Sequence, residues 1–480
     1  MRNDGTYLAQ LLQEQQRPHP MYMRQQYHFM GGPGWINDPN GLVWYKDAYH
    51  FFYQYNPFGL TWGEPCWGHA VSRDLLHWTQ LPPALVPSEP YDMYEQGGCF
   101  SGCALVVGQR LYLLYTGVCE KDGHCVQAQC LAWSDDGVTF QKYENNPVVC
   151  APVGVDPANF RDPKLWREAD GIFYFVCGAS LEGEGAALLF SSQDLFQWQY
   201  QGVLARSEGR FGTMWECPDL IPLGRKRMLC VSPMHCPAYR NVCLVGTFSR
   251  EEGKLLNVEP VCPDAGPDYY AAQSFVDDRG QCVQVAWANG WDWMPQFRRW
   301  GVAEQGFWFT LPRVVTEGAD KLPRFQPHPQ LETLRKKAIP WGRKELTAPW
   351  TLPDAAETAW EILLEIPAQQ QTGGLLLQVG NCFALELTLV SRTLHAYVKD
   401  TGEQTMQDCG TLQLVPGAPV RLQVFLDRCS AEIFADGKCL SVNVFDTAPL
   451  RPVSLIPQGG TLPLQLLQVW QLQHVMEPQT

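Results

Sequence analysis

Apolar and polar residues alternate with a period of two along most of this chain, in short runs bounded by Gly, Asp or Pro. Between about residue 35 and residue 300, an apolar run, a polar turn and a second apolar run recur five times. The five segments read GLVWYKDAYHFFYQY, CALVVGQRLYLLYTG, PKLWREADGIFYFVCG, PDLIPLGRKRMLCVSP and SFVDDRGQCVQVAWANG. Each of them predicts a β-hairpin.

A second repeat follows the hairpins. Four fragments that contain Ser and an acid two residues later recur about every 60 residues: SRDLLHW (72–78), SDDGVTF (134–140), SQDLFQW (192–198) and SREEGKL (249–255). Short strands repeated in five units, without helices between them, predict a five-bladed β-propeller. A β-sandwich whose strands are evenly spaced is the alternative that this pattern leaves open.

The pattern changes after Pro312. The next stretch is Pro-rich and charged, which predicts a connector with one short helix around Gln330 to Lys337. Beyond it, short alternating segments such as TAWEILLEI, FALELTLV and VRLQVFLD predict a β-sandwich of roughly 140 residues. The first 20 or so residues suggest a short amphipathic helix and a tail. We therefore expect an all-β protein with a helix or tail at 1–25, a propeller at 26–315, a linker at 316–342 and a sandwich at 343–480.

Composition narrows the functional classes. Of 480 residues, 45% are hydrophobic and 18% are charged, which is typical of globular domains. The formal net charge of −14, without any Lys/Arg-rich run, excludes a nucleic-acid partner. The N-terminus lacks the apolar region of about 7 to 15 residues that marks a signal peptide. No run approaches the ~18 apolar residues of a membrane span. We expect a cytoplasmic protein, and the oligomeric state stays open.

The aromatic residues make up 12% of the chain, which suits strand-rich folds and sites that stack against sugar faces. The 18 cysteines are scattered among apolar neighbours, so we expect reduced, buried thiols. The nearest approach to a metal cluster is VCEKDGHCVQAQC, with Cys119, His124, Cys125 and Cys130. Its spacing matches no regular zinc pattern, so we expect neither a metal nor a cofactor.

The segment GWINDPNG (34–41) has the composition of a type I turn, in which Asp38 would only accept hydrogen bonds. Its place in the repeat suggests that the carboxylate of Asp38 also takes part in chemistry. Asp38 precedes its hairpin turn by about nine residues, and Asp162 and Glu216 precede theirs by similar gaps. In a propeller this register places the three acids at the start of innermost strands, at one end of the central channel. We expect them to converge in an aromatic-lined pocket.

The equivalent places in the second and fifth units carry no further acid of this kind. They hold Phe100 and Ser101 in the second unit, and Asp268, Tyr269 and Tyr270 in the fifth. A funnel with three acids among aromatic rings is a plausible sugar site, because sugar pockets are mostly apolar with a few polar groups.

Paired carboxyl groups about 5 to 5.5 Å apart suffice for retaining glycoside hydrolysis, in which one is the nucleophile and the other donates a proton. Met214 and Trp215 flank Glu216, and an acid among apolar groups and other anions keeps its proton more readily, so Glu216 is the better proton donor. Asp38 lies in a turn whose backbone N–H groups can hold an anion, so it suits the nucleophile.

Taken together, the motifs resemble those of glycoside hydrolase family 32, which contains invertases, sucrose-6-phosphate hydrolases and fructan β-fructosidases. The matching segments are WINDPNG (35–41), FYQYNP (52–57), WGHAVSRDLLHW (67–78), FSG (100–102), FRDP (160–163), WECPDL (215–220), DYYAAQ (268–273) and, near the C-terminus, LDRCSAEIFADG. The resemblance implies a five-bladed propeller plus β-sandwich. It also implies metal-free, retaining hydrolysis of terminal β-D-fructofuranosyl residues, as in sucrose, sucrose 6-phosphate or short fructo-oligosaccharides.

By motif, the resemblance makes Asp38 the nucleophile on fructose C2, Glu216 the acid/base and Asp162 the transition-state stabiliser. The substrate-binding positions that carry over are Asn37, Gln54, Trp62, Phe100, Ser101, Arg161, Cys217, Tyr270 and Trp287. The Arg161 guanidinium, next to Asp162 in sequence, would hold that carboxylate ionised. The segments GGPGW, FSGC and YYAAQ depart from the family pattern without touching the three acids.

Two other functions stay open on the residues alone: a propeller hydrolase that acts on arabinosides or xylosides, commonly by inversion, and a non-catalytic sugar-binding propeller. The preferred fructoside, and the balance between hydrolysis and fructosyl transfer, also stay open. Recognition of a phosphate would need basic residues near the leaving group, for which Arg298 and Arg299 are candidates.

Overall fold

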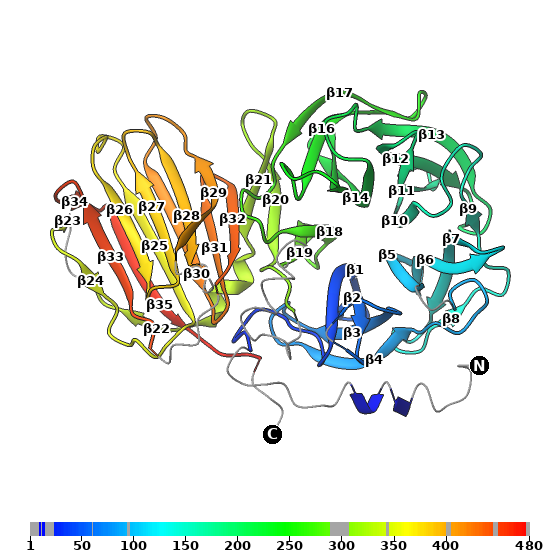
Figure 1. Ribbon diagram of the computed structural model, residues 1–480, viewed down its shortest axis with the longest axis horizontal. Coiled ribbons are helices and arrows are strands. Elements are labelled where there is room, and N and C mark those ends of the chain that lie inside the picture. The colour runs from blue at the N-terminus through cyan, green and yellow to red at the C-terminus, as the bar shows by residue number, and fades with distance from the viewer. Residues whose placement is uncertain are drawn as a thin grey trace.

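The computed structural model of the protein describes residues 9–10, 12–14, 24–59, 61–93, 97–288, 307–341, 345–399, 405–444 and 450–476. In this part of the chain nearly all regular structure is β-strand, which confirms the predicted all-β class (Figure 1). Residues 9–10 and 12–14 are helical, within the segment where a short helix was predicted. No helix among these residues is long and apolar enough to cross a membrane.

Five antiparallel sheets lie around a common centre in the right half of Figure 1. The first runs β1 (Trp35–Tyr45), β2 (Ala48–Asn56), β3 (Cys66–Ser72), β4 (Thr79–Leu85). The second runs β5 (Gly98–Val107), β6 (Arg110–Lys121), β7 (His124–Ser134), β8 (Gln141–Lys142), and β9 (Val149–Cys150) also pairs with β7. The third runs β10 (Phe160–Arg167), β11 (Phe173–Leu181), β12 (Glu184–Ser192), β13 (Gln199–Arg206). The fourth runs β14 (Met214–Leu223), β15 (Lys226–Met234), β16 (Val242–Ser249), β17 (Lys254–Val261). The fifth runs β18 (Tyr270–Val276), β19 (Cys282–Trp287), β20 (Arg313–Glu317), β21 (Pro323–Pro327).

The first strand of each sheet lies next to the first strand of the following sheet, and β18 contacts β1. The two strands of each predicted hairpin are the first two strands of a sheet. The repeated Ser-x-acid fragments form turns between third and fourth strands. In the first of them, Asp74 Oδ1 accepts from the backbone N–H groups of Leu76 and His77 at 3.0 and 2.8 Å. The repeat in sequence is therefore a repeat of one turn geometry.

Residues 316–342 were predicted to be a connector, but most of them belong to regular structure. Residues 323–327 form β21, the outer strand of the fifth sheet, and its two prolines stand at the ends of an edge strand, where a missing N–H removes no ladder bond. The expected helix is a 3₁₀ helix, η3 (Pro329–Leu334), and β22 (Arg335–Ile339) starts directly after it.

The remaining strands form two six-stranded antiparallel sheets that face each other. One has the order β22, β35 (Leu466–Leu472), β25 (Trp360–Ile366), β30 (Val420–Leu426), β31 (Ser430–Ala435), β32 (Lys438–Asn443). The other has the order β24 (Trp350–Thr351), β33 (Val453–Gln458), β26 (Gly374–Val379), β27 (Phe383–Thr388), β28 (Thr393–Lys399), β29 (Met406–Gln413). A two-stranded sheet pairs β23 (Glu345–Leu346) with β34 (Leu462–Pro463).

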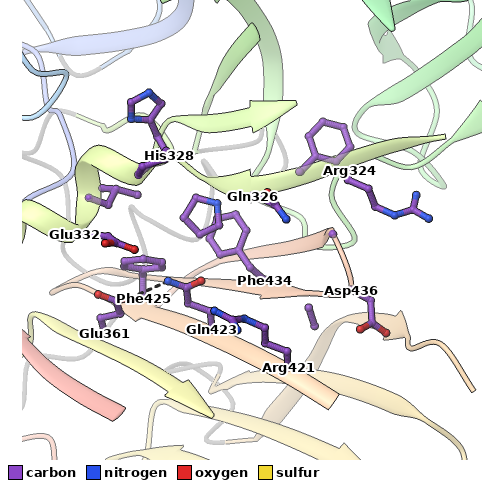
Figure 2. A pocket seen from close by; sticks show the side chains of 16 residues that line it. Arg324, Gln326, His328, Glu332, Glu361, Arg421, Gln423, Phe425, Phe434 and Asp436 are labelled. Carbon is purple, nitrogen blue, oxygen red and sulfur yellow. Dashed lines mark hydrogen bonds between the residues drawn. The ribbon is translucent and has the colours of Figure 1, made fainter. Parts of the chain in front are cut away.

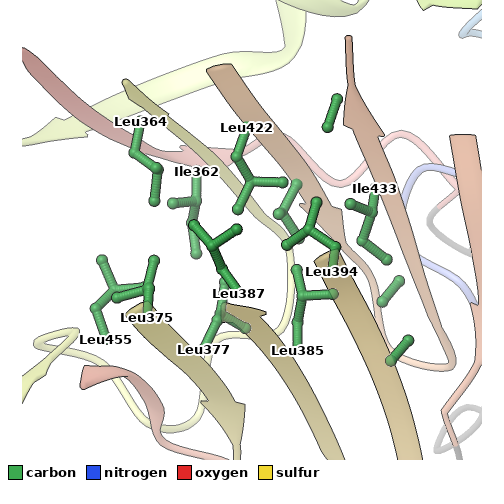
Figure 3. Close-up of a cluster of buried hydrophobic side chains, with 14 of the residues drawn as sticks. Ile362, Leu364, Leu375, Leu377, Leu385, Leu387, Leu394, Leu422, Ile433 and Leu455 are labelled. Atoms are coloured by element: carbon green, nitrogen blue, oxygen red, sulfur yellow. The ribbon is translucent and has the colours of Figure 1, made fainter. Parts of the chain in front are cut away.

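Leucine and isoleucine side chains from both six-stranded sheets point toward one another and fill the space between them (Figure 3). Ile362 and Leu422 come from one sheet, and Leu377 and Leu385 from the other; each is at most 1% exposed. The period-two burial along these strands is the alternation that the sequence predicted.

A buried ionic network joins the five sheets to the two six-stranded sheets. Arg313 of β20 donates to Asp264 Oδ2 and to Glu432 Oε2, both at 2.7 Å. His28, which precedes the first sheet, lies between Glu432 and Asp427, at 3.0 and 2.7 Å. The network ties the two regions together through charged groups that are all withdrawn from water.

Candidate active site

A cavity of about 700 Å³ lies where the first strands of the five sheets begin. The predicted site residues that line it are Asn37, Asp38, Gln54, Trp62, Phe100, Ser101, Arg161, Asp162, Glu216 and Tyr270. Trp62 and Phe100 form an edge-to-face pair in its wall, with ring centroids 5.6 Å apart. The cavity has the size and the mixed apolar and polar lining of a small-molecule site.

Two predicted site residues lie outside the lining. Cys217 is 1% exposed, and its thiol contacts Asp38 and Asp162 without lining the cavity. Trp287 is fully buried and packs at an angle against Trp35 and edge-on against Tyr270, which lines the cavity. Arg298 and Arg299 lie outside the described residues.

The structure adds lining residues that the sequence reasoning missed. They are Cys125, Gln127, Ala158, Asn159, Pro233, Met234, His235, Cys236, Pro237 and Arg240. Most of them come from the far end of the β6–β7 hairpin, the loop before β10 and the loop after β15. No motif marks these positions in the sequence; only knowledge of which hairpin ends face the centre could have indicated them.

A second cavity, of about 600 Å³, lies between β21 and η3 on one side and β30 and β31 on the other (Figure 2). Its acids do not gather, because Glu332 and Asp436 stand at opposite ends. Glu361 accepts a hydrogen bond from Gln423 at 2.7 Å and is paired with Arg335. We therefore place the candidate active site in the first cavity.

The turn predicted at Asp38 is wrong. Residues 35–45 are continuous strand β1, and the pairing of β1 with β2 shifts register between Ile36 and Pro39 and again before Gly41. A β-bulge explains the composition: proline cannot donate to a sheet ladder, and a bulge is one of the few places in a sheet that accepts it. Pro163 and Pro218 stand in the corresponding shifts of β10 and β14.

The prediction that the three acids hold equivalent places is wrong. In β10, β14 and β18 the first residue of each register shift is Asp162, Cys217 or Ala271, with φ of 65°, 48° and 54°. Glu216 lies one residue earlier and corresponds to Arg161 and Tyr270. These backbone angles are rare for residues other than glycine, so the surrounding structure must hold them.

Asp38 accepts hydrogen bonds from three neighbouring side chains, those of Ser101, Cys217 and Asn37. Ser101 Oγ donates to its Oδ2 at 2.5 Å, and Cys217 Sγ donates to the same oxygen at 3.6 Å. Burial and the charge of Glu216 raise the pKa of Asp38, against the lowering effect of hydrogen bonds from Ser101, Asn37 and Cys217.

Asp162 Oδ2 accepts from the Cys217 backbone N–H at 2.9 Å. It also lies 3.5 Å from the Cys217 thiol, whose single proton it shares with Asp38. Burial raises the pKa of Asp162 to about 7; the Arg161 guanidinium opposes this, and the charges of Glu216 and Asp38 reinforce it. Arg161 thus lowers the pKa of Asp162, as predicted, but does not bring it back to the usual range of a carboxylate, and its guanidinium donates to Glu216.

Glu216 receives the hydrogen bonds of Arg161, whose Nε and Nη2 donate to Oε1 at 3.1 and 2.9 Å. Tyr270 donates its hydroxyl to Oε2 at 2.5 Å. The apolar setting that we expected from Trp215 is wrong, because Trp215 packs into the core and donates to Phe211 O. The carboxyl group of Glu216 is oriented by polar donors.

Among the described residues, one group of three metal-ligating side chains lies together: Asp38, Asp162 and Cys217, whose ligand atoms are within 4.8 Å of one another. Cys119, His124, Cys125 and Cys130 are not gathered in this way. The eighteen cysteines all lie in the described part of the chain, and none of them forms a disulfide there. The expectation that the site uses no metal stays a prediction.

Three carboxyl groups line a cavity large enough for a small sugar. A hydroxyl and a thiol hold one of them, and a guanidinium and a phenol hold another. Such an arrangement is typical of a glycosidase. Comparison with known proteins agrees. Residues 28–321 match the glycosyl hydrolases family 32 N-terminal domain, and residues 331–471 match the family's C-terminal domain. The chain belongs to glycoside hydrolase family 32.

Named relatives point the same way. The chain is 32% identical to a sucrose-6-phosphate hydrolase of Escherichia coli, over 93% of this chain and 94% of the relative. It is 33% identical to a raffinose invertase of Escherichia coli, with the same coverage. The structure of a Bombyx mori β-fructofuranosidase in complex with sucrose superposes with a TM-score of 0.83 at 28% identity, covering 98% of both chains. The protein is a glycosidase, and neither alternative function that the sequence left open is favoured.

Proposed function

We propose that the protein is a β-fructofuranosidase, which releases terminal non-reducing β-D-fructofuranosyl residues from sucrose, sucrose 6-phosphate or short fructo-oligosaccharides. The reaction retains configuration and passes through a covalent fructosyl-enzyme. Sucrose in the Bombyx mori structure and the names of the bacterial relatives support this substrate class. The observation that carries the proposal is the meeting of Asp38, Asp162 and Glu216 at one cavity wall.

Asp38 acts as the nucleophile on fructose C2. Ser101 and Cys217 both lie within hydrogen-bond distance of Oδ2, which holds the carboxylate in place for attack. Glu216 protonates the leaving oxygen and then, as a base, activates the water that hydrolyses the intermediate. Arg161 and Tyr270, which bond its two oxygens, fix the direction of that carboxyl group.

Asp162 stabilises the transition state. Positive charge develops at the fructosyl centre, and an ionised carboxylate next to the ring lowers the barrier there. Its Oδ2 is held by the backbone N–H of Cys217, so the carboxylate is already oriented before the substrate binds.

The fold belongs to the same proposal. The five sheets are the blades of a five-bladed β-propeller, supported by the contact of β18 with β1, and the two six-stranded sheets are a β-sandwich. We place the protein in the cytoplasm, which eighteen cysteines without a disulfide among the described residues support.

The test is fructose release from sucrose, sucrose 6-phosphate, kestose and inulin, compared as kcat/KM. Asp38→Ala should abolish release and leave the unfolding temperature close to that of the wild type. Glu216→Gln should slow formation of the fructosyl-enzyme, and least for activated leaving groups that need no proton. Substantial turnover by Asp38→Ala, or an inverted first product, would refute the assignment.

A further inference from the structure

The backbone N–H groups at the β-bulges of β10 and β18 are accepted by buried hydroxyl groups that do not line the cavity. The strands β10, β14 and β18 each contain, at the register shift near their start, a residue at positive φ: Asp162, Cys217 or Ala271. The N–H of this residue does not pair with the neighbouring strand of its own sheet. In β18, Ala271 donates its N–H to Ser232 Oγ at 2.9 Å. In β10, Asp162 donates its N–H to Thr116 Oγ1 at 3.0 Å. A hydroxyl from the preceding sheet thus accepts the bulge N–H in both places.

Thr116 and Ser232 hold equivalent places. Thr116 pairs with Phe100 across β5 and β6, and Ser232 pairs with Glu216 across β14 and β15. Each hydroxyl therefore lies opposite the last residue before a register shift and reaches the bulge of the next sheet. The bulge that Thr116 of the second sheet reaches lies in the third sheet and carries Asp162, the proposed transition-state stabiliser.

Thr116 is also connected to the nucleophile. It is fully buried, and its Oγ1 lies 3.2 Å from the carbonyl oxygen of Ser101, whose own hydroxyl donates to Asp38. It lies 3.0 Å from Gln129 Oε1, the residue that faces it across β6 and β7. One hydroxyl thus contacts the backbone of both residues that flank the reacting centre, Ser101 and Asp162.

Two glutamines of β7 bind the backbone at the start of β10, two residues before Asp162. Gln127 and Gln129 stand two residues apart on β7, so their side chains share one face. Gln127 Oε1 accepts from the Phe160 N–H at 2.9 Å, and Gln129 Nε2 donates to the Phe160 carbonyl at 3.0 Å. Because β10 is the edge strand of its sheet, these side chains satisfy backbone groups that no strand can reach.

We propose that Thr116, supported by Gln129 and Gln127, is a positioning residue that holds Asp162 in its bulge conformation and aims its carboxylate at the sugar. Asp162 at φ 65° is a strained backbone position. Without the acceptor for its N–H, the residue would relax toward ordinary strand geometry and turn its carboxylate. This proposal rests on the role of Asp162 in the proposed function.

The test compares Thr116→Val, Thr116→Ser and a matched control, Thr310→Val. Thr310 is also buried, and its Oγ1 accepts the Ala286 backbone N–H at 3.0 Å, without contact to any of the three acids. Both valine variants remove a buried hydroxyl that accepts a backbone N–H. Thr116→Val also removes the donation of that hydroxyl toward Gln129 and Ser101, so its decrease in unfolding temperature should be at least as large as that of Thr310→Val.

The kinetics should separate them. A misplaced catalytic group costs up to about 10²-fold in rate, so Thr116→Val should lose about 10- to 100-fold in kcat with KM changed less than about threefold. Thr116→Ser, which keeps the hydroxyl, and Thr310→Val should both retain kcat. Gln129→Met should lose kcat in the same direction as Thr116→Val.

Three results would overturn the proposal: unchanged kcat in folded Thr116→Val, an equal loss of kcat in Thr310→Val, or failure of both Thr116→Val and Gln129→Met to fold, which would make these residues structural. The ratios are taken with whichever glycoside the wild-type enzyme hydrolyses fastest. A wild-type enzyme inactive on fructosides would contradict the proposed function and leave the ratio for Thr116 measurable.

Discussion

Replacing His28 should remove a pH-dependent part of the stability. Nδ1 of this buried ring lies 2.7 Å from Asp427 Oδ2, and Nε2 lies 3.0 Å from Glu432 Oε1. Burial lowers the pKa of His28, but the hydrogen bonds and charges of the two carboxylates outweigh it and raise the pKa to about 9. At neutral pH the ring therefore carries protons on both nitrogens.

The sign follows from the unfolded chain, where the histidine pKa is 6.5. Because folding raises the pKa, the contribution of His28 is fully present below pH 6.5 and is lost as the pH rises through about 9. The difference between the two pKa values corresponds to about 3 kcal/mol of unfolding free energy.

Urea unfolding, followed by tryptophan fluorescence at about pH 6.5, 8 and 9.5, measures the pH-dependent contribution of His28 to the unfolding free energy. Over this range the wild type should lose about 3 kcal/mol more unfolding free energy than His28→Gln, which cannot titrate. The control is His77→Gln, since His77 also lies 2.7 Å from a carboxylate, that of Asp74, but is 54% exposed. Exposed ion pairs contribute little, so His77→Gln should follow the wild type at every pH. Parallel curves for the wild type and His28→Gln would refute the reasoning.

Three further changes test the site and its support. Ser101→Ala removes a hydroxyl that donates to Asp38 and should lower kcat/KM for sucrose by about 10- to 100-fold, since hydrogen bonds to charged groups are worth about 1.5–3 kcal/mol; an unchanged kcat/KM would show that the bond has no catalytic role. Burial lowers the pKa of His50 to about 4, so its contribution to stability is present above pH 6.5 and is lost as the pH falls toward 4. His50→Phe should flatten the acid side of a plot of Tm against pH, and an unaltered slope would contradict this. Gly178→Ala would press a Cβ against the Trp215 carbonyl oxygen and should cost about 1–3 kcal/mol, measured by urea unfolding; wild-type stability would contradict the packing.

The strands were predictable because their signals are local. A period of two in hydrophobicity and a fixed turn composition are written in each hairpin, so five repeated units could be read from the sequence. The edge strand β21 was missed because its prolines and charges are those of a loop, and only the neighbouring β20 makes it a strand. The bulge at Asp38 was mistaken for a turn for the same reason, since both structures accept Pro next to a polar residue.

The meeting of the three acids was predictable from repetition, but their individual surroundings were not. Arg161 bonds Glu216, 55 residues away, instead of its neighbour Asp162. Such pairings depend on which sheets adjoin and on the direction that a bulge gives each side chain. Thr116 and Gln129 belong to ordinary strand segments, and nothing in their local sequence indicates that they reach Phe160 or Asp162 in the next sheet.

The absence of a side chain at Gly178 explains why the Asp162 carboxylate, besides its proposed role in the transition state, also accepts the backbone N–H of Cys217. It occupies in the third sheet the place that Thr116 and Ser232 occupy in the second and fourth, opposite the last residue before the register shift. No side chain fits there, because a Cβ would collide with the Trp215 carbonyl oxygen. The next bulge N–H, that of Cys217, therefore takes its acceptor from Asp162 Oδ2. One carboxylate oxygen thus replaces the missing hydroxyl and fixes the side chain in the orientation that its proposed role in the transition state requires.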